Sequence, residues 1–112
     1  MRAEGDRAED AALAYLEGQG LSLEARNYRS RFGEIDLVLD DRGTLVFVEV
    51  RKRSNPRFGS AAESITAGKR DKLVATARQY LAGLRRDVPC RFDAVLIDGA
   101  GGIEWIRDAF GA

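Results

Sequence analysis

The sequence predicts an α/β fold in which helices flank a mixed β-sheet, in the order helix, three strands, helix, two strands. Apolar residues recur at helical spacing in two segments, and they alternate or run together in five shorter ones. The chain has 112 residues, the size of one domain, so a single unit is expected over residues 1–112. It contains no bilayer-length apolar run and no signal-peptide stretch, which predicts a cytoplasmic protein with no membrane partner.

Start and stop signals place each element. The first helix is predicted from Arg7 to Glu17, with Asp6 as its N-cap. The second is predicted from Ala67 to about Leu84, with Thr66 as its N-cap, because its apolar residues follow a helical stripe. The five strands are predicted at residues 21–28, 34–40, 45–53, 91–98 and 103–106.

The composition excludes several kinds of chemistry. The chain has no histidine, so histidine catalysis and imidazole metal ligands are ruled out. Cys90 is the single cysteine, so there is no intramolecular disulfide or multi-cysteine zinc site, and it is expected to be a buried small apolar residue. Any reaction must therefore depend on carboxylates, Lys, Arg, Tyr or hydroxyl groups, alone or with a cation that prefers oxygen ligands.

Charge is balanced over the whole chain but not along it. There are 18 basic and 18 acidic residues, yet residues 1–50 carry −5, residues 51–91 carry +8 and residues 92–112 carry −3. An acidic segment beside a basic one is typical of a metal-dependent enzyme that acts on a polyanion. Solvated faces of ordinary helices and strands would produce the same charge runs.

The second and third predicted strands form a hairpin whose register can be predicted. A two-residue turn at Arg42-Gly43 pairs Asp41 with Thr44. One face of the hairpin is then wholly aliphatic, with Ile35, Leu37, Leu39, Val46, Val48 and Val50. A slip of one residue would bury an acid, so the pattern fixes the register.

The other face of this hairpin places Asp36 opposite Glu49, and Glu34 opposite Arg51. Two carboxylates about 5 Å apart repel each other by on the order of 3 kcal/mol at an effective dielectric near 20. A bridging Mg²⁺ or Mn²⁺, a shared proton, or Arg51 between the acids would each cancel this repulsion. Two interpretations follow: a metal site with Asp36 and Glu49 as ligands, or an internal ion cluster.

The motif Gly33–Asp36 followed by Val48–Arg51 resembles that of PD-(D/E)xK nucleases, which have an acid on one strand and Glu-x-Lys on the next. From Gly5 to Phe110 the chain is similar to the YraN-like family, an uncharacterised bacterial family related to Holliday-junction resolvases. The segments that carry this resemblance are Arg31–Leu37, Leu45–Arg51, Arg57–Gly59, Pro89–Asp93 and Ile103–Ile106.

The resemblance implies a restriction-endonuclease-like core and metal-dependent hydrolysis of phosphodiesters in structured, branched DNA. By position it implies that Glu9 joins Asp36 and Glu49 as ligands of Mg²⁺ or Mn²⁺. Arg51 stands where active nucleases usually have lysine, and it completes the predicted catalytic set of Glu9, Asp36, Glu49 and Arg51. Arginine in proteins stays charged, so Arg51 can hold a phosphate oxygen but cannot accept a proton from water.

Basic residues from the end of the third strand to the second helix are predicted to bind the nucleic-acid backbone: Arg53, Arg57, Lys69, Arg70 and Lys72. A solvated helix face is the alternative for those in the second helix. Trp105 and Phe110 would either stack on bases or pack in the core. A homodimer is expected from the resolvase resemblance.

Two other functions stay open at this point. Arg51 in place of lysine is compatible with a nucleic-acid-binding module that has lost cleavage. If the acids and Arg51 are only a structural cluster, the chain is a protein-interaction domain.

Overall fold

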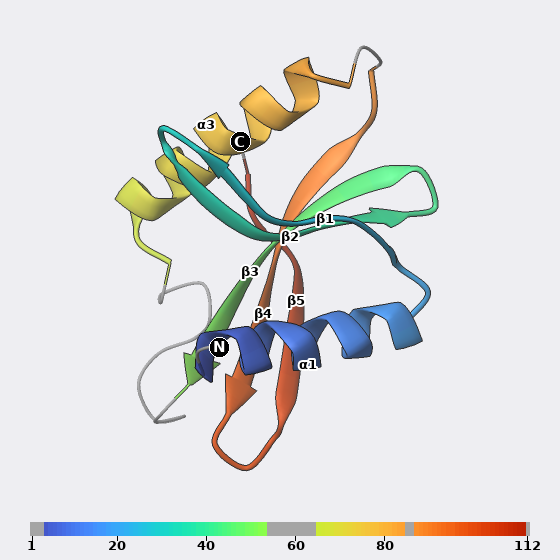
Figure 1. Cartoon of the computed structure of the whole chain (residues 1–112), viewed down its shortest axis with the longest axis vertical. Coiled ribbons are helices and arrows are strands. Elements are labelled where there is room, and N and C mark those ends of the chain that lie inside the picture. Colours follow the sequence, from blue (N-terminus) through green and yellow to red (C-terminus); the bar gives the residue numbers. More distant parts are fainter. Residues whose placement is uncertain (1–3, 54–64, 85–86, 112) are drawn as a thin grey trace.

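The computed structural model describes residues 4–53, 65–84 and 87–111. In this part of the chain five strands form one sheet, with one helix on each face (Figure 1). The elements are α1 (Glu4–Gly18), β1 (Ser22–Ser30), β2 (Gly33–Asp41), β3 (Thr44–Arg53), α3 (Ala67–Ala82), β4 (Cys90–Asp98) and β5 (Ile103–Phe110). This order and the mixed sheet are those predicted. Neither helix in these ranges is both long and apolar enough to cross a membrane.

The strands lie in the sheet in the same order as in the sequence, β1-β2-β3-β4-β5. All neighbouring pairs are antiparallel except β3 and β4, which are parallel. A parallel pair needs a crossover connection, and α3 lies in that connection. The crossover brings the start of α3 back toward the sheet.

The register of the β2–β3 hairpin is the predicted one. Its ladder runs from the pair of Leu37 and Val48 to the pair of Asp41 and Thr44. Both residues of the connecting turn have positive φ, 53° for Arg42 and 96° for Gly43, as the twist of a two-residue hairpin requires.

Each face of the sheet carries its own apolar core. On the α1 side, the buried residues are Ala12, Leu16, Leu21, Leu37, Leu39, Val46, Val48 and Val95. On the α3 side, they are Ile35, Val38, Leu45, Phe47, Ile65, Leu73, Ala77, Phe92, Ala94 and Phe110. The hairpin therefore contributes to both cores, because Val38, Leu45 and Phe47 make its second face apolar between the turn and the acids.

Ile35 does not lie where the alternation predicts. It packs in the α3-side core, whereas Leu37 and Leu39 pack in the α1-side core. Regular alternation would place all three on one face, so the face that β2 presents changes between Ile35 and Leu37. The reason is an interruption of strand pairing at Asp36, described below.

Two element ends differ from the prediction by three residues or more. Helix α1 begins at Glu4, so Asp6 lies inside the helix instead of capping it; acids in a first turn are stabilised by the helix dipole without being caps. Strand β5 continues past Ile106 to Phe110. It does so across a bulge, because Asp108 has φ 52° and its N–H donates to the buried Asp93 side chain at 2.9 Å.

Cys90 is exposed, which contradicts the prediction that it is buried. It is the first residue of β4, and the buried stretch of that strand begins only at Phe92. The general tendency of free cysteine to be buried was therefore a poor guide at this position.

Candidate metal centre and the adjoining pocket

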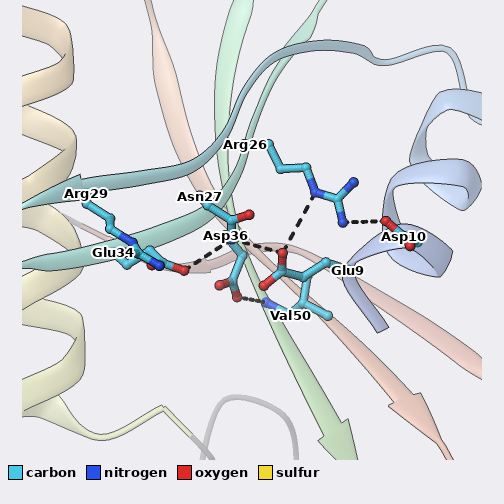
Figure 2. A network of polar contacts seen from close by, with 8 residues as sticks. All are labelled: Glu9, Asp10, Arg26, Asn27, Arg29, Glu34, Asp36 and Val50. Carbon is cyan, nitrogen blue, oxygen red and sulfur yellow. Dashed lines mark hydrogen bonds and ion pairs between the residues drawn. The ribbon is translucent and has the colours of Figure 1, made fainter. Parts of the chain in front are cut away.

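The pairing of β2 with both neighbouring strands is interrupted at Asp36. The ladder to β1 skips Asn27 and Asp36, and Asn27 has φ 53°, a left-handed conformation that asparagine adopts more readily than most residues. The ladder to β3 ends at Leu37 and Val48. Beyond it, the N–H of Val50 donates to Asp36 Oδ2 at 2.8 Å (Figure 2). The Asp36 carboxyl thus occupies a gap in the sheet.

Three carboxylates meet at this gap, from Glu9 of α1 and from Glu34 and Asp36 of β2. One oxygen from each lies within 4.8 Å of the others. The Asn27 amide joins two of them, because its Nδ2 donates to Glu9 Oε1 at 2.9 Å and to Glu34 Oε1 at 3.1 Å (Figure 2). Oxygen ligands of this kind suit hard divalent cations, so the cluster could hold a metal ion.

Three of the acids in and beside this cluster have an arginine partner. The shortest N···O distances are 3.8 Å for Arg26 and Glu9, 2.6 Å for Arg29 and Glu34, and 3.1 Å for Arg51 and Glu49. Within the described ranges, no cationic side chain lies within 4.0 Å of the Asp36 carboxyl. The arginines alone therefore do not neutralise the cluster.

The pKa values reflect this imbalance. Burial is the main reason that the pKa of Asp36 is raised to about 8, and the charge of Glu49 adds to the rise. Burial also raises the pKa of Glu49, although the charges of Arg51 and Lys69 and a hydrogen bond with Asp36 lower it. The raised pKa values favour one proton held by the pair of Asp36 and Glu49 at neutral pH. A shared proton and Arg51 thus both reduce the predicted repulsion in the absence of a cation.

A pocket of about 230 Å³ opens beside the acids. Residues of β2, β3 and α3 line it: Gly33, Glu34, Glu49, Arg51, Lys69, Lys72 and Leu73. In the described part of the chain, neither lysine has an acid within ion-pair distance, and the buried Nε of Arg51 has no hydrogen-bond partner. Glu34 belongs both to this pocket and to the acidic cluster. The pocket therefore offers unused cationic donors directly beside a potential metal site.

Lys69 reaches the pocket because of how α3 begins. Thr66 caps the helix, and its hydroxyl accepts the N–H of Lys69 at 3.3 Å. This cap was predicted, and it places Lys69 in the first turn, with Lys72 one turn further along the same side.

The structure brings Glu9 and Asp36 together, and Glu49 lies against both Asp36 and Arg51. Glu34, which the sequence placed only in the alternative ion cluster, joins Glu9 and Asp36. Asn27 was not predicted to take part. An asparagine inside a predicted strand is unfavourable there and was the one available signal of a special position.

The cations predicted to bind nucleic acid do not all lie together. Lys69 and Lys72 line the pocket. Arg70 points elsewhere: its Nε donates to the carbonyl of Ile65 at 3.0 Å, and its guanidinium lies 5.6 Å from the centre of the Phe110 ring. The side chains of Arg53 and Arg57 lie outside the described part of the structure.

Trp105 and Phe110 pack against the protein. Trp105 Nε1 donates to Asp93 Oδ2 at 2.9 Å, and the Phe110 ring stacks on Phe92 with centres 4.9 Å apart. Asp93 is fully buried and also accepts from Arg91 at 3.0 Å. These hydrogen bonds within the fold give Asp93 a structural role.

Comparison with known proteins identifies relatives along almost the whole chain. Residues 8–97 match the profile of the uncharacterised protein family UPF0102. A UPF0102 protein of Nitrosomonas europaea is 59% identical over 108 residues, covering 95% of this chain and 92% of its own length. One of Nitrosospira multiformis is 56% identical over 112 residues, covering 98% and 94%. One of Methylobacillus flagellatus is 56% identical over 114 residues, and the match covers both chains completely.

Proposed function

This chain belongs to the uncharacterised protein family UPF0102, and we propose that it is a divalent-metal-dependent nuclease that hydrolyses phosphodiesters in structured DNA. The observation that carries the proposal is the cluster of Glu9, Glu34 and Asp36 directly beside a pocket with unpaired cationic donors. Acids for a metal and cations for a phosphate are the two elements that such a reaction requires.

The acids fit Mg²⁺ or Mn²⁺. Glu9, Glu34 and Asp36 each offer a carboxylate oxygen to one point, and Glu49 is hydrogen-bonded to Asp36 beside them. Asp36 lacks an arginine partner and holds a proton, so a cation that replaced this proton would complete the charge balance. When bound, the cation would lower the pKa of a coordinated water and neutralise charge on the phosphate.

The remaining side chains would hold the substrate. Lys69 and Lys72 line the pocket, and the Nε of Arg51 has no hydrogen-bond partner among the described residues while its Nη2 pairs with Glu49. Arg51 cannot lose its proton in water, so its part is to bind a phosphate oxygen and stabilise the charge that develops there.

The resemblance to PD-(D/E)xK nucleases and Holliday-junction resolvases supports the same conclusion. It favours branched DNA as the substrate and a homodimer as the active form, because two strands are cut symmetrically. A cytoplasmic location, expected from the sequence, is part of the same proposal. The substrate, the dimer and the location are parts of the proposed function.

Substitution of Asp36 tests the reaction. Purified protein is incubated with a four-way DNA junction and with nicked duplex in the presence of Mn²⁺, and the products are resolved on a denaturing gel. Asp36→Asn removes one metal-binding charge while keeping the shape of the side chain. We expect it to lower the cleavage rate by about 100-fold or more.

Asp40→Asn is the matched control, since Asp40 is another half-buried acid of β2 and lies outside the acidic cluster. Its side chain accepts the N–H of Gly43 at 3.4 Å, a contact that an amide oxygen keeps. This variant should cleave like wild type. Equal activity in wild type and Asp36→Asn, or no cleavage by either, would remove catalysis from the proposal.

The ion pair between Arg51 and Glu49 favours one second candidate, a nucleic-acid-binding module without cleavage. Arg51 occupies an oxygen of Glu49 at 3.1 Å and so competes with a metal for it. Such a module would bind DNA with an affinity that falls steeply with salt and that Asp36→Asn leaves intact. Binding isotherms at several salt concentrations separate it from the nuclease.

A further inference from the structure

The turn between β1 and β2 exposes an aromatic ring at the edge of the candidate site. Arg31 and Phe32 form this two-residue turn, and 40% of Phe32 is exposed. Among the described residues, the other exposed large apolar side chain is Leu23, at the opposite end of β1. One exposed ring is ordinary on a protein surface, so its surroundings must show what it contacts.

The ring is carried by a turn that is fixed to helix α3. The N–H of Phe32 donates to Ser30 Oγ at 3.0 Å, and Ser30 Oγ lies 2.9 Å from the hydroxyl of Thr76. Thr76 is fully buried, and its hydroxyl in turn donates to the carbonyl of Lys72 at 2.8 Å. Phe32 is therefore held in place relative to Lys72.

One cation lies on the ring, and others line the adjoining pocket. The guanidinium carbon of Arg31 lies 4.8 Å from the centre of the Phe32 ring, a cation–π contact. The next residue along the chain, Gly33, lines the pocket together with Lys69 and Lys72. The pocket also contains Glu34 and Glu49, but its three cations outnumber these two acids. An exposed aromatic beside such cations is the combination that binds single-stranded nucleic acid, with bases on the ring and phosphates on the cations.

We propose that Phe32 is a stacking platform for one unpaired base of a nucleic acid whose phosphate occupies the pocket of Lys69, Lys72 and Arg51. This inference rests on the proposed nucleic-acid substrate and narrows it. A base inside a regular duplex is already stacked on its neighbours, so the platform selects strands with unpaired or splayed bases. Such bases occur in single strands and at branch points.

The test measures binding without cleavage. Fluorescence anisotropy with EDTA present compares a labelled oligothymidine with a blunt duplex of the same length. Phe32→Ala should weaken binding to the single strand about ten-fold, because one stacked base is lost, and should change duplex binding little. Phe32→Trp should keep the affinity, since an indole also stacks.

Leu23→Ala is the control, because Leu23 is 39% exposed and lies away from the pocket. It should bind like wild type. Irradiation of an oligonucleotide that carries 5-iodouracil should cross-link it to Phe32, which mass spectrometry identifies. Equal single-strand affinity in wild type and Phe32→Ala, an equal loss in Leu23→Ala, or no binding by wild type overturns the inference. Because no metal is present, these results are independent of whether the protein cleaves DNA.

Discussion

In the acidic cluster, Asp36 is the carboxyl group that has no cationic side chain of the described residues within 4.0 Å. Its neighbours Glu34 and Glu49 are paired with Arg29 and Arg51, whereas Asp36 accepts one backbone N–H and lies beside other carboxylates. A buried carboxyl in that position stays protonated or binds a cation. Both states are compatible with this geometry, so the charge of Asp36 is set by pH and by available metal.

This arrangement predicts a pH dependence of stability in the metal-free protein. The pKa of Asp36 is about 8 in the folded state against 3.8 for an unperturbed group. Because the folded pKa is the higher one, the stabilisation is complete below 3.8 and is lost as pH rises through 8. We expect the free energy of unfolding to fall by more than about 2 kcal/mol between about pH 5 and about pH 9, as measured by urea unfolding with EDTA present.

Asp36→Asn should remove most of this fall in the free energy of unfolding with pH. At about pH 9 the variant should be more stable than wild type. A smaller slope of the same sign should remain, because the pKa of Glu49 is raised as well. Asp40→Asn should keep the wild-type slope. If the stability of Asp36→Asn depended on pH as strongly as that of wild type, the inference that the pKa of Asp36 is raised would be wrong.

At the scale of elements, the start of α3 decides where Lys69 lies. Thr66→Ala removes the hydroxyl that accepts the Lys69 N–H. We expect the free energy of unfolding to fall by about 0.5–1 kcal/mol, the lower part of the range for caps, because the contact is 3.3 Å long. Thr66→Ser keeps the acceptor and should restore most of the loss. The midpoints of urea unfolding of wild type, Thr66→Ala and Thr66→Ser measure this change in stability. Equal midpoints would exclude the cap as a source of stability.

The element order and the hairpin register could be predicted because local pattern determines them. A single register keeps Leu37, Leu39, Val46 and Val48 on one face, so no distant information was needed. The position of Ile35 could not be predicted. Its place coincides with the left-handed backbone of Asn27 in β1 and with the missing pair of Asn27 and Asp36, which arise only once the strands are assembled.

The candidate site likewise contains some contacts that the sequence pattern predicts and others that it does not. The closeness of Asp36 and Glu49 follows from the hairpin register, whereas Glu9 was placed there by resemblance alone, since it lies on a helix distant in sequence. Glu34 was expected to face Arg51, yet its closest cation is Arg29, because β2 twists away from β3 beyond Leu37. Contacts that depend on how a helix or a twisted strand is packed leave no local sequence pattern.

At the scale of the whole molecule, the acidic cluster joins two layers of the fold. Glu9 belongs to helix α1, whereas Glu34 and Asp36 belong to the sheet (Figures 1 and 2). The polar links between the layers at this point are the Asn27 amide and Arg26, which also pairs with Asp10. A cation held by all three carboxylates would therefore attach α1 to the sheet.

This attachment predicts that metal binding stabilises the fold and protects α1. With Mn²⁺ at about 100 times its dissociation constant, the free energy of unfolding should rise by about 2.7 kcal/mol. The measurement is made above the Asp36 pKa of about 8, so that the proton does not compete with the metal. Amides of α1 should exchange more slowly with Mn²⁺ than with EDTA, as hydrogen–deuterium exchange records.

Glu9→Gln distinguishes a bridge between layers from a cation bound to the sheet alone. It should lose most of the stabilisation by Mn²⁺ and the slower exchange in α1, whereas Glu24→Gln, a change at an exposed acid of β1, should keep both. If Glu9→Gln were stabilised as much as wild type, the ion would be held by β2 and β3 without the helix. Glu49 would then replace Glu9 in the ligand set, because it is the other acid that contacts Asp36.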